Sequence, residues 1–177
     1  MAVSDIEAVE IIDALAAVGV RSWVVGGWGV DALAERVSRT HRDLDLMILA
    51  EDLDAAVDVL VRSGYAVTTD WLPVRVELDD GIRVVDLHPM HPDPVGGWWQ
   101  AAPGGGRYEY PPDAWTSGLL AGRTVECASV ALQLAVQAPE ARAAEWLLFA
   151  DADVHADPQL LRRAFAYLDQ HPAEVLA

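Results

Sequence analysis

One stretch decides the fold: Trp23-Val-Val-Gly-Gly-Trp-Gly-Val-Asp-Ala-Leu-Ala-Glu35, which continues through residues 36–42 into Asp43-Leu-Asp-Leu-Met-Ile48. The short apolar, β-branched run at 22–25 predicts a buried strand, and Gly26-Gly27 ends it. Residues 28–35 predict a short helix, and the apolar run at 44–49 predicts the next strand. A Gly-Gly turn lets the backbone approach a phosphate, with amides of the following helix facing the anion. The plainer interpretation is a tight strand-to-helix turn.

Two carboxylates open the second strand. Asp43 and Asp45 are two residues apart, so their side chains share one face of the strand. Such a pair can hold one Mg²⁺, or two ions about 3.5–4 Å apart. Most Asp-x-Asp pairs in acidic proteins are solvated strand ends, but the position of this pair, inside an apolar run and downstream of Gly-Gly, favours a metal site.

A third carboxylate lies in a later apolar run, Val84-Val-Asp-Leu-His88. An unpaired carboxylate is costly to bury, which makes Asp86 more informative than a surface acid. If this strand neighbours the one with Asp43 and Asp45, three acids converge. Asp86 would then complete the metal shell or act as general base toward an acceptor hydroxyl. Glu77 on the preceding strand is the rival third carboxylate. His88 shares the face of Asp86 and could orient the acceptor, or be satisfied locally.

Two arginines stand beside the carboxylate pair. Arg39 and Arg42 would steady a triphosphate in a nucleotide site. The alternative is that they pair with surface acids.

The rest of the chain predicts an α/β (α+β) fold. Ser4 and Glu7 form a capping box before a helix that ends at Gly19, and residues 51–63 have a clear amphipathic helical pattern. Strand signals follow at 65–69, 74–78 and 82–87, with a hairpin signal at Asp79-Asp80-Gly81. This order predicts a mixed sheet with helices packed mainly on one side.

The Pro- and Gly-rich segment 89–112 predicts an ordered loop without regular structure. Trp98 and Trp99 within it would anchor the loop on the core, or else cap a bound base or acceptor. We therefore expect a core over residues 1–112. Residues 113–177 are expected to form a mainly helical C-terminal extension, with helices at 129–137, 139–150 and about 158–170.

The composition limits which partners and which kinds of site are expected. The formal net charge of −16 over 177 residues argues against a nucleic-acid partner and suits a cationic small molecule, although acidic surfaces are common. Cys127 is the single cysteine, which excludes an intrachain disulfide and a cysteine-based zinc site. No apolar run approaches the ~20 residues of a membrane helix, so we expect a cytoplasmic protein without a membrane partner. The sequence does not predict the oligomeric state.

Five motifs of the chain together resemble those of a known family. They are Val25-Gly-Gly-Trp-Gly-Val-Asp-Ala-Leu33, Arg39-Thr-His-Arg-Asp-Leu-Asp-Leu46, Asp70-Trp-Leu-Pro-Val-Arg-Val-Glu77, Val85-Asp-Leu-His-Pro89 and Tyr108-Glu-Tyr-Pro-Pro112. Together they are similar to the small antibiotic nucleotidyltransferases of the DNA polymerase β superfamily, of the aminoglycoside-2″-adenylyltransferase and lincosamide nucleotidyltransferase type. The resemblance covers roughly residues 5–134.

The resemblance implies a polymerase-β-like fold and a reaction. A nucleoside monophosphate, usually AMP from ATP, would pass with Mg²⁺, as two ions, to a hydroxyl of a small molecule such as an aminoglycoside or a lincosamide. It assigns Gly26 and Gly27 to the triphosphate and Asp43 and Asp45 to the metals. It makes Asp86 the third carboxylate and the base.

After Leu134 the chain departs from this pattern. Glu145–Val154, which includes Asp151 and Asp153, resembles instead the metal-binding segment of family-2-type glycosyltransferases, and we favour a structural tail over a second active site. Two further hypotheses stay open: a nucleotide-binding homologue that has lost catalysis, and a protein-modifying nucleotidyltransferase of toxin–antitoxin type.

Overall fold

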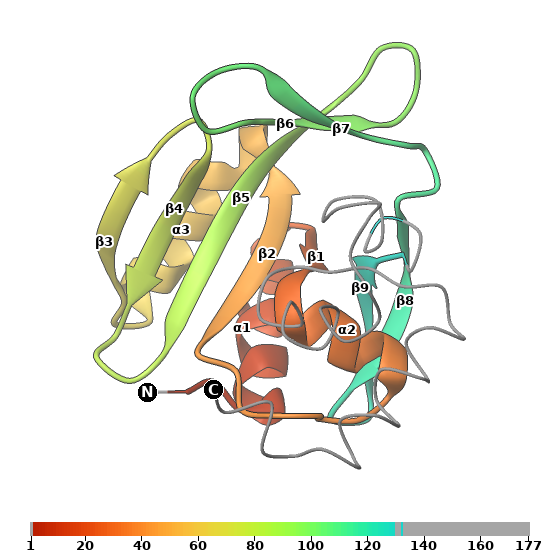
Figure 1. Ribbon diagram of the computed structural model, residues 1–177. Helices are drawn as coiled ribbons and strands as arrows, with labels where there is room; N and C mark the ends of the chain where they lie inside the picture. The colour runs from red at the N-terminus through yellow and green to blue at the C-terminus, as the bar shows by residue number, and fades with distance from the viewer. Residues whose placement is uncertain (1, 130–131, 133–177) are drawn as a thin grey trace.

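A mixed β-sheet of nine strands organises the residues that the computed structural model describes, 2–129 and 132 (Figure 1). The strands are β1 Ser22–Val24, β2 Asp43–Leu49, β3 Ala66–Trp71, β4 Arg75–Asp79, β5 Val84–Pro92, β6 Trp98–Ala101, β7 Arg107–Tyr110, β8 Trp115–Leu120 and β9 Arg123–Ala128. Their order is β3-β4-β5-β2-β1-β9-β8, with β6 pairing β5 and β7. The pairs β2–β5 and β1–β9 are parallel and the others antiparallel. The predicted mixed sheet is confirmed.

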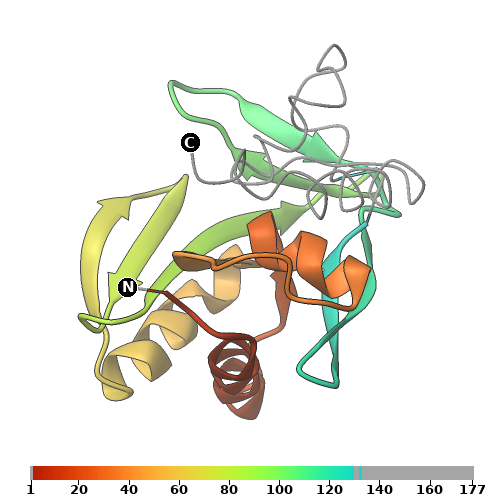
Figure 2. The same ribbon diagram turned by 60° about the horizontal axis from the view of Figure 1, so that its bottom comes forward.

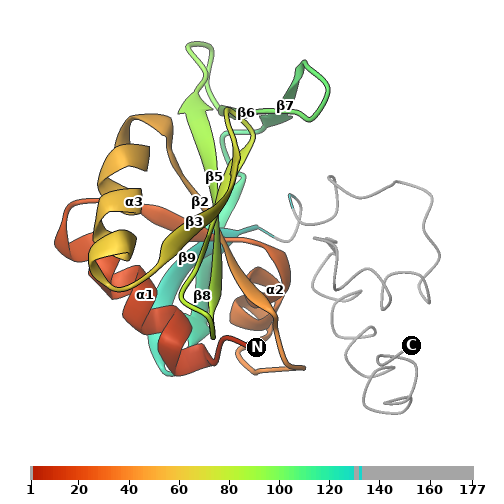
Figure 3. The same ribbon diagram turned by 90° about the vertical axis from the view of Figure 1, so that its left-hand side faces the viewer.

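Helices α1 (Asp5–Ala17) and α3 (Leu53–Arg62) lie side by side on one face of this sheet (Figures 2 and 3). The predicted capping box starts α1: Ser4 Oγ accepts from the Glu7 amide at 3.3 Å, and the Ser4 amide donates to Glu7 Oε2 at 2.9 Å. A 3₁₀ turn, η1 (Ala50–Asp52), leads into α3. The buried faces of both helices join one apolar cluster with β2, β4 and β5.

The short helix α2 (Gly26–Ala34) begins directly after β1, two residues before the predicted start. Gly26 has a φ of +61°, which favours glycine, and the Gly29 amide bonds the Val25 carbonyl at 3.0 Å. Farther along, α2 packs on β8, where a Cβ on Gly118 would lie 2.6 Å from the Ala32 backbone. This close packing fixes the direction in which α2 leaves the sheet.

The prediction of an irregular loop over 89–112 is wrong. β5 runs on to Pro92, and its last three residues pair with β6, which forms an antiparallel hairpin with β7 (Figure 1). The glycines that suggested a loop, Gly104 to Gly106, all have positive φ and lie between β6 and β7. They form the turn of a hairpin, while the aromatic residues before and after them form its strands.

The sheet also continues past residue 112, because β8 and β9 are two of its strands. The expectation of mainly helical structure is therefore wrong for residues 115–128. Apart from 129 and 132, the residues assigned to later helices lie outside the described part, and so do Asp151 and Asp153. Within that part, no helix is long and apolar enough to cross a bilayer.

Candidate active site

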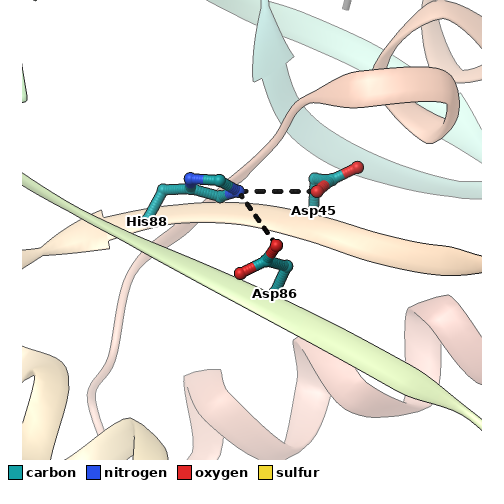
Figure 4. Close-up of side chains that lie close together, drawn as sticks. All are labelled: Asp45, Asp86 and His88. Carbon is teal, nitrogen blue, oxygen red and sulfur yellow. Dashed lines mark hydrogen bonds and ion pairs between the residues drawn. The ribbon is translucent and has the colours of Figure 1, made fainter. Parts of the chain in front are cut away.

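Parallel pairing of β2 with β5 brings the predicted carboxylates together. Asp45 lies opposite Asp86, and Met47 lies opposite His88. Because residues paired in register point to the same side of a sheet, Asp45, Asp86 and His88 share one face (Figure 4). One ligand atom from each lies within 4.8 Å of the others. His88 Nε2 is 3.4 Å from Asp45 Oδ1 and 3.9 Å from Asp86 Oδ2.

Asp86 lies in the least hydrated part of this cluster, at 4% exposed. Its Oδ2 pairs with Arg75, whose Nη1 also lies 3.6 Å from Glu77 Oε2. Its Oδ1 is buried and has no hydrogen-bond partner among the described residues. Burial raises the pKa of Asp86 above its ordinary value, and His88 and Arg75 oppose that rise. Burial together with specific charged partners is typical of carboxylates at functional sites.

Asp43 and Glu77 stand at the edge of the cluster. Asp43 pairs with Arg42, which donates from Nε at 2.9 Å, and the 4.8 Å group of ligand atoms does not include Asp43. Glu77 lies opposite Asp86 on β4 and accepts from Thr68 Oγ1 at 2.9 Å. Of the two rivals for the third carboxylate, Asp86 therefore lies with Asp45 and His88.

The Gly-Gly turn is fastened to the strand that carries Asp45. The Val25 amide donates to the Asp45 carbonyl at 3.1 Å, so Gly26 follows directly beside the backbone of that strand. A Cβ on Gly27 would lie 2.8 Å from the Arg39 guanidinium and would clash with the His41 ring. Glycine at position 27 thus lets Arg39 lie against the start of α2.

A buried pair that sequence reasoning missed holds the segment between α2 and β2. Asp31 and His41 are 0% and 3% exposed, and His41 Nε2 lies 2.6 Å from Asp31 Oδ2. Ser38 donates to both Asp31 oxygens, from Oγ at 2.5 Å and from its amide at 3.1 Å. The His41 ring also packs on Trp28, with centroids 4.4 Å apart. These contacts anchor the segment that bears Arg39 and Arg42.

The two tryptophans predicted to cap a base or acceptor pack on neighbouring rings. Trp98 packs on Trp23, with ring centroids 5.6 Å apart, in a second apolar cluster. Trp99 stacks on His91 at 4.2 Å. The hairpin residues that reach the site are Gln100 and, through it, Tyr110, which the sequence reading did not single out.

The donor set fits the metal that nucleotide chemistry uses. Asp45 and Asp86 offer carboxylate oxygens, the ligands Mg²⁺ prefers, and one oxygen of Asp86 is buried without a hydrogen-bond partner in the described part. Asp43, which has a partly exposed side chain, lies two residues before Asp45 on the same face.

Comparison with known proteins identifies the family. The model of the aminoglycoside-2″-adenylyltransferase family matches residues 7–143, which extends the likeness beyond Leu134. The chain belongs to the aminoglycoside-2″-adenylyltransferase family. As a member of this family it is an enzyme of the nucleotidyltransferase class.

Two relatives from this family of enzymes differ in how much of their length the chain spans. A lincosamide resistance protein of Staphylococcus haemolyticus is 32% identical over 133 residues, 75% of this chain and 83% of that protein. A 2″-aminoglycoside nucleotidyltransferase of Klebsiella pneumoniae is 34% identical over 117 residues, 60% of this chain and 57% of that protein.

Solved structures confirm the nucleotidyltransferase fold. The lincomycin-bound crystal structure of a lincosamide antibiotic adenylyltransferase matches with a TM-score of 0.71 at 30% identity, over 80% of this chain and 90% of that one. An aminoglycoside enzyme of this family, solved in complex with adenylyl-2″-tobramycin, matches with a TM-score of 0.54 at 24% identity, over 94% of this chain and 90% of that one. The second match supports the fold alone.

Proposed function

We propose that this enzyme transfers AMP from ATP, with Mg²⁺, to a hydroxyl group of a small antibiotic. The observation that carries the proposal is the cross-strand pair Asp45–Asp86 beside the Gly26-Gly27 turn. A phosphate-accommodating turn and a pair of carboxylates are the two parts that nucleotidyl transfer needs.

The donor would bind between the turn and the carboxylates. The amides at the start of α2 face the triphosphate in this proposal, with Arg39 beside them. Asp43, Asp45 and Asp86 would hold the metal, whose role when bound is to neutralise charge on the phosphates. Arg42 has an exposed side chain, so it can turn from Asp43 toward the nucleotide.

Asp86 would act as the base. It accepts the proton of the acceptor hydroxyl while that oxygen forms a bond to the α-phosphorus, and the bond from phosphorus to the pyrophosphate oxygen breaks. Pyrophosphate leaves with the bonding electrons. The burial of Asp86, which raises its pKa, supports this role because a stronger base takes the proton more readily.

We place lincosamides ahead of aminoglycosides as the acceptor. The chain spans 83% of the lincosamide resistance protein and 57% of the aminoglycoside enzyme. Contacts of the acceptor with Glu77, His88, Trp98 and Trp99 stay predictions. Of these four residues, His88 is the one whose side chain lies in the carboxylate cluster.

The test is a transfer assay with α-labelled ATP, Mg²⁺ and a panel of lincosamides and aminoglycosides. We expect label on a lincosamide and release of pyrophosphate. Asp86→Asn should lower kcat by about 10²–10⁴-fold, the usual contribution of a general base. Asp58→Asn, a change of the same chemistry at an exposed position on α3, is the matched control and should keep full activity. No labelled acceptor, together with no ATP binding by calorimetry, would refute the proposal.

A further inference from the structure

A chain of three side chains links the β6–β7 hairpin to the carboxylate cluster. The Tyr110 hydroxyl on β7 donates to Gln100 Oε1 on β6 at 2.7 Å. The Gln100 amide nitrogen lies 3.1 Å from the Val74 carbonyl oxygen and 3.2 Å from His88 Nδ1 on β5. Gln100 and Tyr110 are 6% and 9% exposed, so water competes little for these bonds.

The partners of Gln100 decide which of its side-chain atoms is the nitrogen. The Val74 carbonyl can only accept, so the Gln100 atom that faces it is the NH₂ group. The other side-chain atom, the oxygen, accepts from Tyr110. The same NH₂ group faces His88 Nδ1, and an amide NH₂ can only donate. Nδ1 of His88 is therefore an acceptor, and the proton of the neutral ring is on Nε2.

The protonated nitrogen points at the carboxylates. His88 Nε2 is the atom that lies near Asp45 Oδ1 and Asp86 Oδ2 (Figure 4). A ring nitrogen that bears a proton has no lone pair to give to a metal, although its position beside two carboxylates resembles a ligand set.

We propose that Gln100 and Tyr110 are positioning residues that hold His88 as a hydrogen-bond donor toward Asp45 and Asp86, so that His88 does not coordinate the metal. The proposal rests on the proposed function for the presence of that metal. Without His88 as a ligand, all protein ligands of the metal site are oxygen atoms, which favours Mg²⁺ over softer ions. The hairpin then acts on the site through the hydrogen bonds of Gln100 and Tyr110.

The first test reads the tautomer of His88 in the full chain without metal. Long-range ¹H–¹⁵N correlation spectra report which ring nitrogen carries the proton, and His88→Asn assigns the signals. We expect an unprotonated Nδ1 and a protonated Nε2, with a mixture of both tautomers in Gln100→Leu. A proton on Nδ1 in the unmodified protein, or an unchanged His88 signal in Gln100→Leu, would overturn the proposal.

The second test uses Mn²⁺ as the probe and pulsed electron paramagnetic resonance as the readout. We expect no nitrogen bound directly to Mn²⁺. A directly bound nitrogen that disappears in His88→Asn would overturn the proposal. Absence of any Mn²⁺ binding would count against the proposed function instead, and the tautomer spectrum would then decide this inference by itself.

Discussion

Two histidine–aspartate pairs lie near the Gly26-Gly27 turn, and they differ in burial and in contact distance. His41 and Asp31 are both buried, and their nearest atoms are 2.6 Å apart. His88 and Asp45 have side chains 18% and 21% exposed, with 3.4 Å between the nearest atoms. Both oxygens of Asp31 have partners, whereas one oxygen of Asp86, beside the second pair, has none among the described residues.

The contrast separates groups that hold the segment between α2 and β2 in place from groups that form the carboxylate cluster. A buried pair in which both carboxylate oxygens have partners stabilises the fold and fixes a segment, here the one that carries Arg39 and Arg42. A cluster with long contacts and a buried acceptor without a partner lowers the stability of the fold. A ligand that bonds to that acceptor removes this free-energy cost. Desolvated, imperfectly satisfied carboxylates of this kind concentrate at functional sites.

The largest expected effect tests that division through stability. Asp31→Ala leaves the buried His41 without its acceptor, and Ser38 loses its acceptor too, so we expect a loss of about 3–5 kcal/mol in the free energy of unfolding. Asp45→Ala breaks a partly exposed contact and should change it by less than about 1 kcal/mol. Urea unfolding of both variants measures the difference. Equal losses of stability in the two variants would show that both pairs stabilise the fold to the same extent.

A smaller loss of stability is expected at Gly27, which lies between the buried His41–Asp31 pair and the strand that carries Asp45. Gly27→Ala places a methyl group against His41 and Arg39, and overpacking of this kind costs about 1–3 kcal/mol. Because Arg39 would be pushed away from the turn, KM for ATP should rise more than kcat falls. In Gly27→Ala/Arg39→Ala the stability loss should shrink, since part of the clash is with the guanidinium. An unchanged KM for ATP would place the nucleotide elsewhere.

The sequence predicts the centre of the site because the information is local there. Asp43 and Asp45 open one apolar run and Asp86 interrupts another. Whether these two strands are neighbours stayed open in the sequence; the structure pairs them in parallel, and the register puts Asp45 beside Asp86.

The supporting residues could not be predicted in the same way, because tertiary contacts decide them. Asp31 lies within a short helix, and nothing local distinguishes it from a surface acid until His41 returns to it. Gln100 sits in a Pro- and Gly-rich segment whose short strands exist because β5 extends to pair with β6. Arg75 did carry a signal: it is two residues from Glu77, hence on the same face of β4 as the carboxylates.

The smallest expected effect tests whether a buried oxygen atom without a hydrogen-bond partner is enough to indicate a functional residue. The Tyr65 hydroxyl, in the apolar cluster under α1 and α3, is such an atom within residues 2–129 and 132. Its burial raises the pKa of Tyr65 to about 12, with Arg83 opposing the rise. We expect Tyr65→Phe to keep full transfer activity and to change stability by no more than about 1 kcal/mol near neutral pH, because no hydrogen bond is lost.

The pH dependence of stability distinguishes Tyr65→Phe from the unmodified protein. Below the ordinary tyrosine pKa of about 10 the folded and unfolded chains are both protonated at this residue. Between about 10 and about 12 the unfolded chain releases the proton first, so the stability contributed by Tyr65 falls as pH rises. Urea unfolding on both sides of that window should show this fall in the unmodified protein and a smaller one in Tyr65→Phe. Tyr108→Phe, at an exposed tyrosine, is the matched control. If Tyr65→Phe instead lowered transfer, an unpartnered oxygen would signal function even far from the carboxylates, and the contrast between the two histidine–aspartate pairs would lose its meaning.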